Sequence, residues 1–266
     1  MGGSLGLAIK KYKLAKEVLG LSQKQSSLVD AIKVGAIDIA ENDIQKAVKH
    51  SDLIVLATPV DSILKLLPTI NQYVRRGCLV TDLGSTKVDV VEKAQKSLSH
   101  PMFFVGSHPL VGSEKMGILN ARAELFENAS CIMTPTPQTH NGAKEKIMTL
   151  WTKIGAKVKL LNPEEHDEIL GYISHLPHLA AFALMEAIPQ KHLEFSTQGL
   201  KDTTRIASSS VQVWNDICLS NATNIIKSID EYVRHLGYLR SALVNRDSKM
   251  LMHHLTVAKE KRDGIL

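Results

Sequence analysis

The chain has 266 residues, of which 44% are hydrophobic and 22% are charged, and its formal net charge is +5. This composition is typical of a soluble globular protein of one large or two ordinary domains, and no apolar run reaches the roughly 20 residues that a membrane helix needs. The lysines and arginines are dispersed among acids, which argues against nucleic acid as a partner and favours small anionic ligands.

The chain opens directly into a helix of small and apolar residues, with Gly2, Gly3 and Ser4 in its first turn. Glycines at a helix N-terminus let a phosphate approach the backbone N–H groups, and the helix dipole favours the negative charge there. We therefore expect these residues to bind a dinucleotide, although a glycine-rich start is also typical of a floppy terminus.

A short buried strand is predicted over residues 17–22, followed by a polar turn and a helix. In a dinucleotide-binding fold, an acid at the end of this second strand holds the ribose 2′-hydroxyl. Ser22 stands there instead, with Gln23 and Lys24 beside it, and this group is suited to hydrogen-bond and neutralise a 2′-phosphate. The segment favours NADP over NAD, with a solvated polar loop as the alternative.

Two further strand–helix units are predicted, with strands over residues 52–57 and 78–83. The first of these strands is a continuous apolar run, which is typical of a parallel sheet covered on both faces. Because ligands of open α/β sheets bind at the carboxyl ends of the strands, we expect Thr58, Pro59 and Ser85 to face the ligands. For Ser85, capping of the following helix is the common alternative.

A strand over residues 103–106 delivers the segment 106–117 to the same edge of the sheet. Three glycines and one proline interrupt this segment, so we expect a loop rather than a helix or a regular strand. His108 lies in it and can titrate near neutral pH with one ring nitrogen ready to accept a proton, as a general base does. In a chain with eleven histidines, a surface or packing role is the alternative.

The α/β pattern ends with two strands and a helix, over residues 131–135, 142–154 and 157–161. We therefore place a dinucleotide-binding domain at residues 1–161 and an all-helical domain at residues 162–266. The helices of the second part carry heavy apolar faces, which predicts a homodimer through that domain. Their expected bounds are residues 164–179, 221–243 and 248–261.

Metal-ligating patterns are weak. His175 and His178 lie three residues apart on one predicted helix face, where Pro177 should kink the helix or mark a new start, but no HExxH pattern or third ligand accompanies them. The three cysteines are far apart and form no CxxC pair, which suits a reducing cytoplasm, and no secretory signal opens the chain. We therefore predict a cytoplasmic protein without a metal site.

Arg205 lies in a segment of the helical half that is rich in small polar residues. A guanidinium group binds a carboxylate through two hydrogen bonds, so Arg205 is a candidate for holding an anionic substrate. An ordinary surface salt bridge is the alternative.

Seven motifs, taken in order, resemble the prephenate and arogenate dehydrogenase family, the oxidoreductases of tyrosine biosynthesis. They are DLGSTK at 82–87, GSHP at 106–109 with GSEK at 112–115, LFENA at 125–129, HD at 166–167, SHLPH at 174–178, DTTRIA at 202–207 and WNDI at 214–217. The resemblance implies a Rossmann-like α/β domain followed by an all-α domain. It also implies oxidative decarboxylation of prephenate or arogenate, with hydride transfer to a nicotinamide cofactor.

The resemblance also assigns residue roles. His108 matches the catalytic histidine that takes the proton of the ring hydroxyl, and Ser85 and Lys87 match residues close to it. Arg205 matches the arginine that grips a substrate carboxylate. The other positions that match the substrate cleft are His178, Ser113, Glu114 and Trp214. The positions that match supporting residues are His175 and Asp202.

The chain departs from the family pattern in two places. The family opens with a strand and a Gly-x-Gly-x-x-Gly turn, whereas here Gly2 matches the third glycine, so we expect the first strand to be missing and the working protein to begin roughly ten residues earlier. The segment from Ser22 to Ser26 resembles NADP-preferring arogenate dehydrogenases of cyanobacterial type, which favours arogenate, although His178 also suits prephenate enzymes. The alternatives are an NAD-dependent prephenate dehydrogenase and a cofactor-binding protein that has lost turnover.

Overall fold

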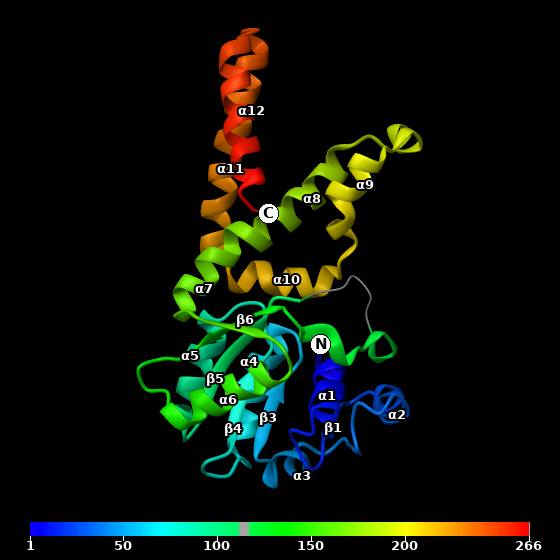
Figure 1. Ribbon diagram of the computed structural model, residues 1–266, viewed down its shortest axis with the longest axis vertical. Coiled ribbons are helices and arrows are strands. Elements are labelled where there is room, and N and C mark those ends of the chain that lie inside the picture. The colour runs from blue at the N-terminus through cyan, green and yellow to red at the C-terminus, as the bar shows by residue number, and fades with distance from the viewer. Residues whose placement is uncertain (112–116, 266) are drawn as a thin grey trace.

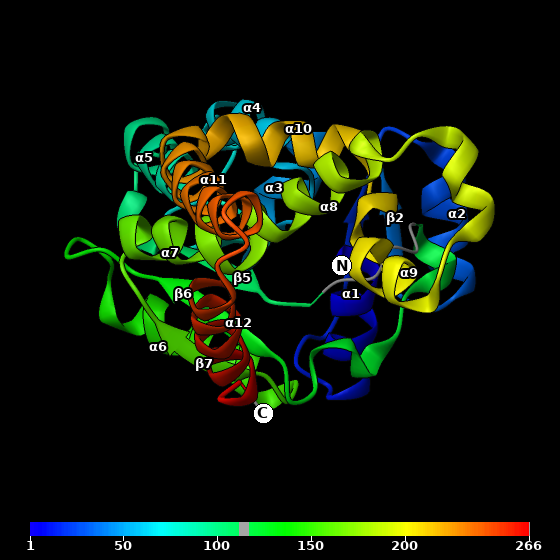
Figure 2. The same cartoon turned by 90° about the horizontal axis from the view of Figure 1, so that it is seen from above.

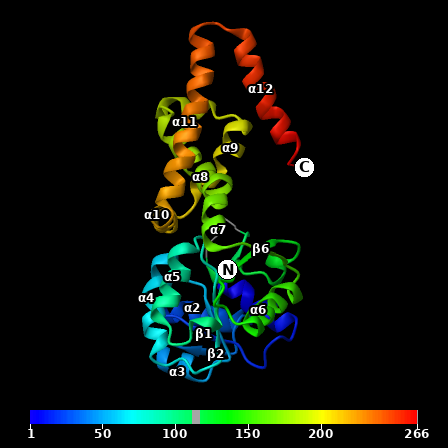
Figure 3. The same ribbon diagram turned by 90° about the vertical axis from the view of Figure 1, so that its left-hand side faces the viewer.

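The computed structural model describes residues 1–111 and 117–265. It has an α/β part that contains the N-terminus and a helical part stacked on it (Figure 1, Figure 3). Among the described residues, none of the helices is long and apolar enough to cross a membrane.

The α/β part alternates strands and helices, as the apolar runs predict. Its strands are β1 (Leu19–Leu21), β2 (Ile39–Glu41), β3 (Leu53–Leu56), β4 (Leu79–Asp82), β5 (Phe104–Pro109), β6 (Ser130–Thr134) and β7 (Lys157–Leu160). Its helices are α1 (Gly2–Lys11), α2 (Gln25–Lys33), α3 (Ile44–Lys49), α4 (Val60–Asn71), α5 (Val88–Ser97) and α6 (Asn141–Lys153). The sequence patterns did not reveal β2, which is only three residues long.

The strands form two separate sheets. β1 and β2 pair in parallel, and β3, β4, β5, β6 and β7 pair in that order. Helices cover both faces of the larger sheet: α4 and α5 pack on one face, and α1 and α6 pack on the other. β1 and β3 are edge strands, and in the described part of the chain no strand lies between them.

The prediction of a loop from Gly106 onward was wrong for its first residues, because β5 continues to Pro109. β6 runs antiparallel to β5, and His108 pairs there with Ile132. Gly106 permits this pairing rather than breaking it, since a Cβ at Gly106 would lie 2.4 Å from Oγ1 of Thr134. His108 is therefore held in a buried strand and not in a loop.

The helical part consists of α7 (Pro163–Leu170), α8 (Leu176–Ala187), α9 (Gln198–Thr204), α10 (Val211–Ser220), α11 (Ala222–Val244) and α12 (Ser248–Asp263). Asn162 and Glu165 form a capping box that starts α7 directly after the last strand. A π-helical turn, Gly171–His175, separates α7 from α8, and Pro177 lies in the first turn of α8, as a new helix start requires.

The helical part meets the α/β part mainly through α7 and α10. α10 lies across the top of the α/β part and contacts α4 (Figure 2). α11 and α12 form a hairpin that stands away from the α/β part (Figure 1). The carboxyl ends of the strands therefore face a set of helices rather than open solvent.

Candidate active site between the two parts

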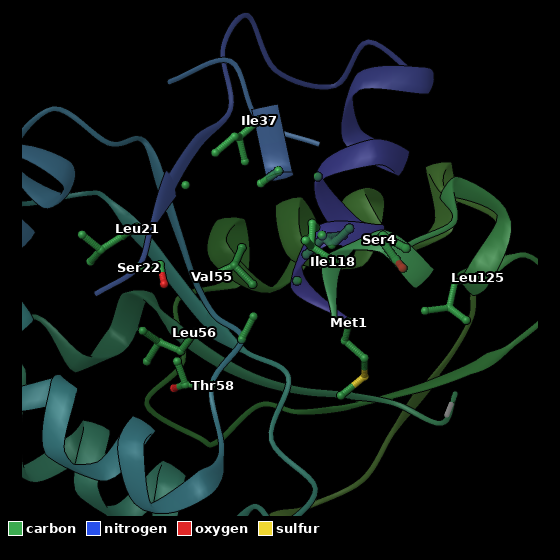
Figure 4. Close-up of a pocket in the computed structure, with 18 of the residues that line it drawn as sticks. Met1, Ser4, Leu21, Ser22, Ile37, Val55, Leu56, Thr58, Ile118 and Leu125 are labelled. Carbon is green, nitrogen blue, oxygen red and sulfur yellow. The ribbon is translucent and has the colours of Figure 1, made fainter. Parts of the chain in front are cut away.

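A cavity of about 2080 Å³ lies where the two parts meet. It is lined by the start of α1 and the ends of β1 and β3 (Figure 4). The turn after β4 and residues of α8 and α10 line it as well. Ten of the residues predicted to bind ligands line it: Gly2, Gly3, Ser4, Ser22, Thr58, Ser85, His108, His178, Arg205 and Trp214.

Other predicted residues lie elsewhere. Gln23, Lys24 and Pro59 are exposed and do not line the cavity. Ser113 and Glu114 lie outside the described residues.

His108 is the first member of a buried hydrogen-bonded chain. Its Nδ1 lies 2.9 Å from Nε2 of His166, and Nδ1 of His166 lies 2.7 Å from Oδ1 of Asp167. The Asp167 carboxylate in turn accepts hydrogen bonds from the backbone N–H groups of Lys87 and Val88, at 2.7 and 2.9 Å. A carboxylate fixed by two backbone donors is thus connected to the candidate base through one imidazole.

The hydrogen bonds from His108 through His166 to Asp167 determine which ring nitrogens of the two histidines carry protons. Asp167 only accepts, so Nδ1 of His166 carries the proton and Nε2 of His166 is an acceptor. Nδ1 of His108 must then donate to His166, which leaves the lone pair of His108 on Nε2. Because His108 is 8% exposed and lines the cavity, it presents an unprotonated nitrogen to a ligand there.

Burial keeps these histidines neutral. Removal from water lowers the pKa of His108 well below its usual value, and the neighbouring His166 and Lys87 lower it further. Burial also lowers the pKa of His166, although its hydrogen bond to Asp167 acts in the opposite direction. His108 is thus a base that is already unprotonated at neutral pH.

We expect the buried histidines to make the fold sensitive to acid. Burial lowers the pKa of His175 from 6.5 to about 4, so the unfolded chain takes up protons before the folded chain does as the pH falls. The contribution of neutral His175 to the free energy of unfolding is therefore complete above about pH 6.5 and is lost as the pH falls toward 4. It amounts to roughly 3 kcal/mol. Urea unfolding between about pH 7.5 and pH 4.5 measures this loss of stability. In the matched variant His175→Asn, the free energy of unfolding should fall less steeply over the same pH range. Equal midpoints across this range would contradict the assignment.

Lys87 does not reach the cavity. Its ammonium group is fully buried, pairs with Oδ2 of Asp82 and donates to the carbonyl of Ser107 at 3.1 Å. Oδ1 of Asp82 also accepts from the backbone N–H of Ser107. Lys87 lies close to His108, as the resemblance implies, but it holds the preceding residue Ser107 in place and does not line the cavity.

Ser85 lines the cavity and does not cap the following helix. α5 begins at Val88, and the Asp167 carboxylate accepts from the first N–H groups of that helix. Asp167 thus takes the capping role that the sequence offered to Ser85. The Ser85 side chain faces the same cavity as His108.

The helical part supplies the opposite wall. His178 and Trp214 are stacked, with ring centroids 3.8 Å apart, and Nδ1 of His178 donates to the carbonyl of Ser174 at 2.9 Å. Arg205 ends α9 and lines the cavity beside them. This wall offers an aromatic platform, an imidazole Nε2 and a cation, which suits a ring-bearing carboxylate.

The two residues expected to support this wall, His175 and Asp202, differ in their position relative to the cavity. Nδ1 of His175 accepts from Asn221 at 3.0 Å, and Nε2 of His175 is buried with no hydrogen-bond partner in the described region. Asp202 is exposed and pairs with Gln198, away from the cavity. Only His175 therefore lies behind the cleft.

The start of α1 also lines the cavity. Among the described residues no side chain caps α1, and a Cβ at Gly2 would lie 2.9 Å from Cβ of Ala57. Oγ of Ser4 accepts from the backbone N–H of Arg122, so Ser4 also anchors the helix. An uncapped helix start without side chains fits the phosphates of a dinucleotide.

Within the described residues no group of three or more His, Cys, Asp or Glu side chains is arranged to hold a metal ion. His175 and His178 both lie against Trp214 instead, with ring centroids 6.0 and 3.8 Å from the indole. Their spacing on the helix serves aromatic packing.

Family models match most of both parts. The model described as prephenate dehydrogenase, nucleotide-binding domain, matches residues 5–160, and the model described as prephenate dehydrogenase, dimerization domain, matches residues 162–257. The chain belongs to the prephenate dehydrogenase family. It is an oxidoreductase of this type, as the motifs predicted.

Individual members of the prephenate dehydrogenase family are similar over nearly the whole chain. A prephenate dehydrogenase of Bacillus subtilis is 36% identical over 272 residues, which covers 100% of this chain and 73% of the relative. A structure of prephenate dehydrogenase from A. aeolicus, solved with hydroxyphenyl propionate and NAD+, has a TM-score of 0.93 at 30% identity and covers 99% of this chain and 94% of that one. Synechocystis arogenate dehydrogenase has a TM-score of 0.83 at 26% identity, covering 99% and 96%.

Sequence reasoning gave His166 and Asp167 no chemical role. Both are almost fully buried, although they are polar residues in the first turns of an otherwise exposed helix start. A histidine followed by an acid directly after a capping box was the only local signal. Their link to His108 spans 58 residues and becomes visible only in the fold.

We expect replacement of His166 to lower kcat. In His166→Leu, Nδ1 of His108 loses its acceptor, so the ring is free to turn and to change tautomer; kcat should fall about 10- to 100-fold with little change in KM. His166→Gln keeps an acceptor oxygen on the side chain and should recover part of the loss. If both variants behave alike, or if only KM changes, His166 does not orient His108.

Proposed function

We propose that this chain oxidatively decarboxylates a cyclohexadienol dicarboxylate, prephenate or arogenate, and uses NADP as the hydride acceptor. The observation that carries the proposal is His108, whose Nε2 lone pair faces a cavity that the uncapped start of α1 and Arg205 also line. A base, a phosphate site and a carboxylate site thus surround one space.

The bound nicotinamide supplies an electrophilic carbon that accepts the hydride. Nε2 of His108 takes the proton of the ring hydroxyl as the hydride leaves the same carbon, and a carbonyl forms. The bond to the ring carboxylate then breaks, carbon dioxide leaves, and its electron pair completes the aromatic ring. The proton on His108 returns to the ring oxygen, so the reaction consumes and releases no net proton.

The remaining residues orient the two reactants. Arg205 is placed to hold a substrate carboxylate by paired hydrogen bonds, and the stack of His178 on Trp214 supports the substrate from the helical side. Ser85 faces the same space as His108 and offers a hydroxyl to the substrate oxygen. Because aromatisation and loss of carbon dioxide drive the step, positioning is the main task of the protein.

The NADP preference rests on Ser22, which lines the cavity at the end of β1 without an acid there. We expect Ser22→Asp to lower the ratio of kcat/KM with NADP to kcat/KM with NAD at least about tenfold, because a carboxylate repels a 2′-phosphate and accepts from a ribose hydroxyl. Ser26→Asp is the matched control, since it adds the same charge at an exposed position outside the cavity lining. An unchanged ratio in Ser22→Asp would remove the basis for NADP.

Two substrates differ only at the side chain, which is an amine in arogenate and a keto group in prephenate. The resemblance of the Ser22 segment to cyanobacterial enzymes and the likeness to Synechocystis arogenate dehydrogenase support arogenate, whereas the name of the Bacillus subtilis relative supports prephenate. The absorbance of reduced nicotinamide, followed with each substrate and with NADP and NAD, compares the four pairs directly. Cofactor binding without turnover in all four would favour a binding protein that has lost catalysis.

We also propose that the chain acts as a homodimer through the hairpin of α11 and α12. Large apolar side chains are exposed along both helices, which is unusual for a surface in water. They are Ile226, Val233, Leu236, Leu243, Val244, Met252 and Leu255. The match of this region to a dimerization domain supports the same interface.

A further inference from the structure

The corner between α10 and α11 contains a buried asparagine. Asn221 separates the two helices and is 4% exposed. It does not line the cavity, so it is not placed to contact a reactant there. Burial of an amide costs free energy unless its donors and its acceptor are hydrogen-bonded, so the partners of Asn221 show what its side chain holds.

The amide of Asn221 is hydrogen-bonded at both of its polar atoms. Nδ2 donates to the carbonyl oxygen of Asp167 at 2.7 Å and lies 3.0 Å from Nδ1 of His175. Because a carbonyl oxygen only accepts, the atom beside it must be the amide nitrogen, and this fixes the orientation of the amide. Oδ1 accepts from Nδ2 of Asn224 at 2.9 Å.

This orientation determines the tautomer of His175. The amide donates to Nδ1, so the proton of the neutral ring is on Nε2. Burial lowers the pKa of His175 to about 4, which keeps the ring neutral near pH 7. The ring meets Trp214 edge to face, with centroids 6.0 Å apart, and Trp214 stacks on His178 to form the aromatic wall of the cavity. Asn221 therefore fixes the ring that supports the aromatic wall.

Asp167 connects the same amide to the candidate base. Its carbonyl oxygen accepts from Asn221, and its carboxylate accepts from Nδ1 of His166. Nε2 of His166 in turn accepts from His108. Asp167 thus contacts the amide through its backbone and supports the base through its side chain.

The residue before Asn221 adds a second contact at this corner. Oγ of Ser220 lies 2.9 Å from Oγ1 of Thr86, which is fully buried and follows Ser85. The hydroxyl of Ser220 donates to the carbonyl of Ile217 at 3.2 Å, so Thr86 donates to Ser220. The corner is therefore also tied to the turn that places Ser85 in the cavity.

We propose that Asn221 is a positioning residue whose amide holds His175, behind the aromatic wall, and Asp167, behind the base, in one fixed relation. The proposal rests on the proposed function, since it gives Asn221 a part in that reaction. Loss of the amide would leave two buried acceptors unpaired, the carbonyl of Asp167 and Nδ1 of His175, so both sides of the cavity would be free to shift. Replacement of His166, by contrast, frees only the base.

Asn221→Ala tests the proposal through the separate changes in kcat and KM. We expect kcat to fall about tenfold and KM for the substrate to rise about five- to tenfold, because the base and the aromatic wall are both released. Ile225→Ala is the control for lost stability, since Ile225 is also 4% exposed, lies in α11 and does not line the cavity. It should lower Tm and leave both constants unchanged at a temperature where circular dichroism shows both variants folded.

The tautomer of His175 tests the contact without any substrate. Nitrogen NMR of protein labelled at histidine reports which ring nitrogen carries the proton, and the signal is assigned by its absence in His175→Asn. We expect the proton on Nε2 in the wild type and on Nδ1 in Asn221→Asp, where an acceptor oxygen replaces the donor. Asn221→Ala only removes the donor and should show both tautomers. Asn141→Asp, exposed at the start of α6, adds the same charge and should leave the signal unchanged.

Three results would overturn the proposal. The first is a proton on Nδ1 of His175 in the wild type, and the second is one and the same tautomer in the wild type and in both Asn221 variants. The third is a set of kinetic constants in Asn221→Ala that matches Ile225→Ala, or a change of kcat alone. Lack of turnover in the wild type would instead refute the proposed function, and the tautomers would still decide whether Asn221 fixes His175.

Discussion

Replacing His108 with asparagine is expected to lower kcat by about 10²- to 10⁴-fold and to leave KM for substrate and cofactor within a few-fold. The asparagine amide can still donate to Nε2 of His166, so the buried chain that ends at Asp167 keeps its partner. It cannot accept a proton at neutral pH, and the hydride would have to leave an alcohol that is still protonated. Initial rates at saturating and limiting substrate separate the two constants.

The matched control is His192→Asn, an exposed histidine outside the cavity lining. It should leave kcat, KM and Tm unchanged. The His108 variant should also keep the wild-type far-UV circular dichroism, because its neighbours remain paired. A His108→Asn enzyme with nearly wild-type kcat would show that another group takes the proton.

Replacing Arg205 with alanine is expected to raise KM for the substrate by about 10- to 100-fold while lowering kcat much less. Arg205 lines the same cavity as His108, and we propose that it binds a substrate carboxylate that is present both before and after the reaction. Because this contact is equally present in the bound substrate and in the transition state, its loss weakens binding rather than chemistry. Arg205→Lys keeps the positive charge but lacks the paired donors, so its KM should lie between that of the wild-type enzyme and that of Arg205→Ala.

Arg76→Ala is the control for the removal of a positive charge. Arg76 is exposed on the loop before β4 and does not line the cavity, so its loss should not change KM. A similar rise of KM in both variants would point to long-range attraction by net charge. A fall in kcat with unchanged KM in Arg205→Ala would instead place Arg205 at the reacting atoms.

The sequence predicted those helices and strands whose own residues show a clear apolar pattern. Apolar runs marked β3, β4 and β6, and helical spacing marked α11, because these patterns depend on which face is buried and not on a distant partner. The continuation of β5 to Pro109 was not predictable in this way. Its extended shape depends on antiparallel pairing with β6, which lies more than twenty residues later in the chain.

The sequence predicted the residues of the candidate site, and the resemblance implied their roles, but neither predicted the buried contacts that orient them. His108, Ser85 and Arg205 stand out by type and context, and all three line one cavity. Lys87 was expected close to His108, like Ser85, but its side chain points into the interior because its ammonium group forms a buried ion pair with Asp82. Asp82 lies five residues earlier, but only the contact of its strand with Ser107 shows that the pair supports β5.

We propose that His108 is the base and acts in its neutral form. The pH dependence of kcat/KM for the wild-type enzyme and for His108→Asn tests this most directly, over the pH range in which circular dichroism shows the fold intact. Because burial lowers the pKa of His108, the acid limb of the wild-type profile should have its midpoint below pH 6.5, and this limb should be absent from the residual activity of the variant. A midpoint above pH 6.5, or the same acid limb in both enzymes, would contradict the claim.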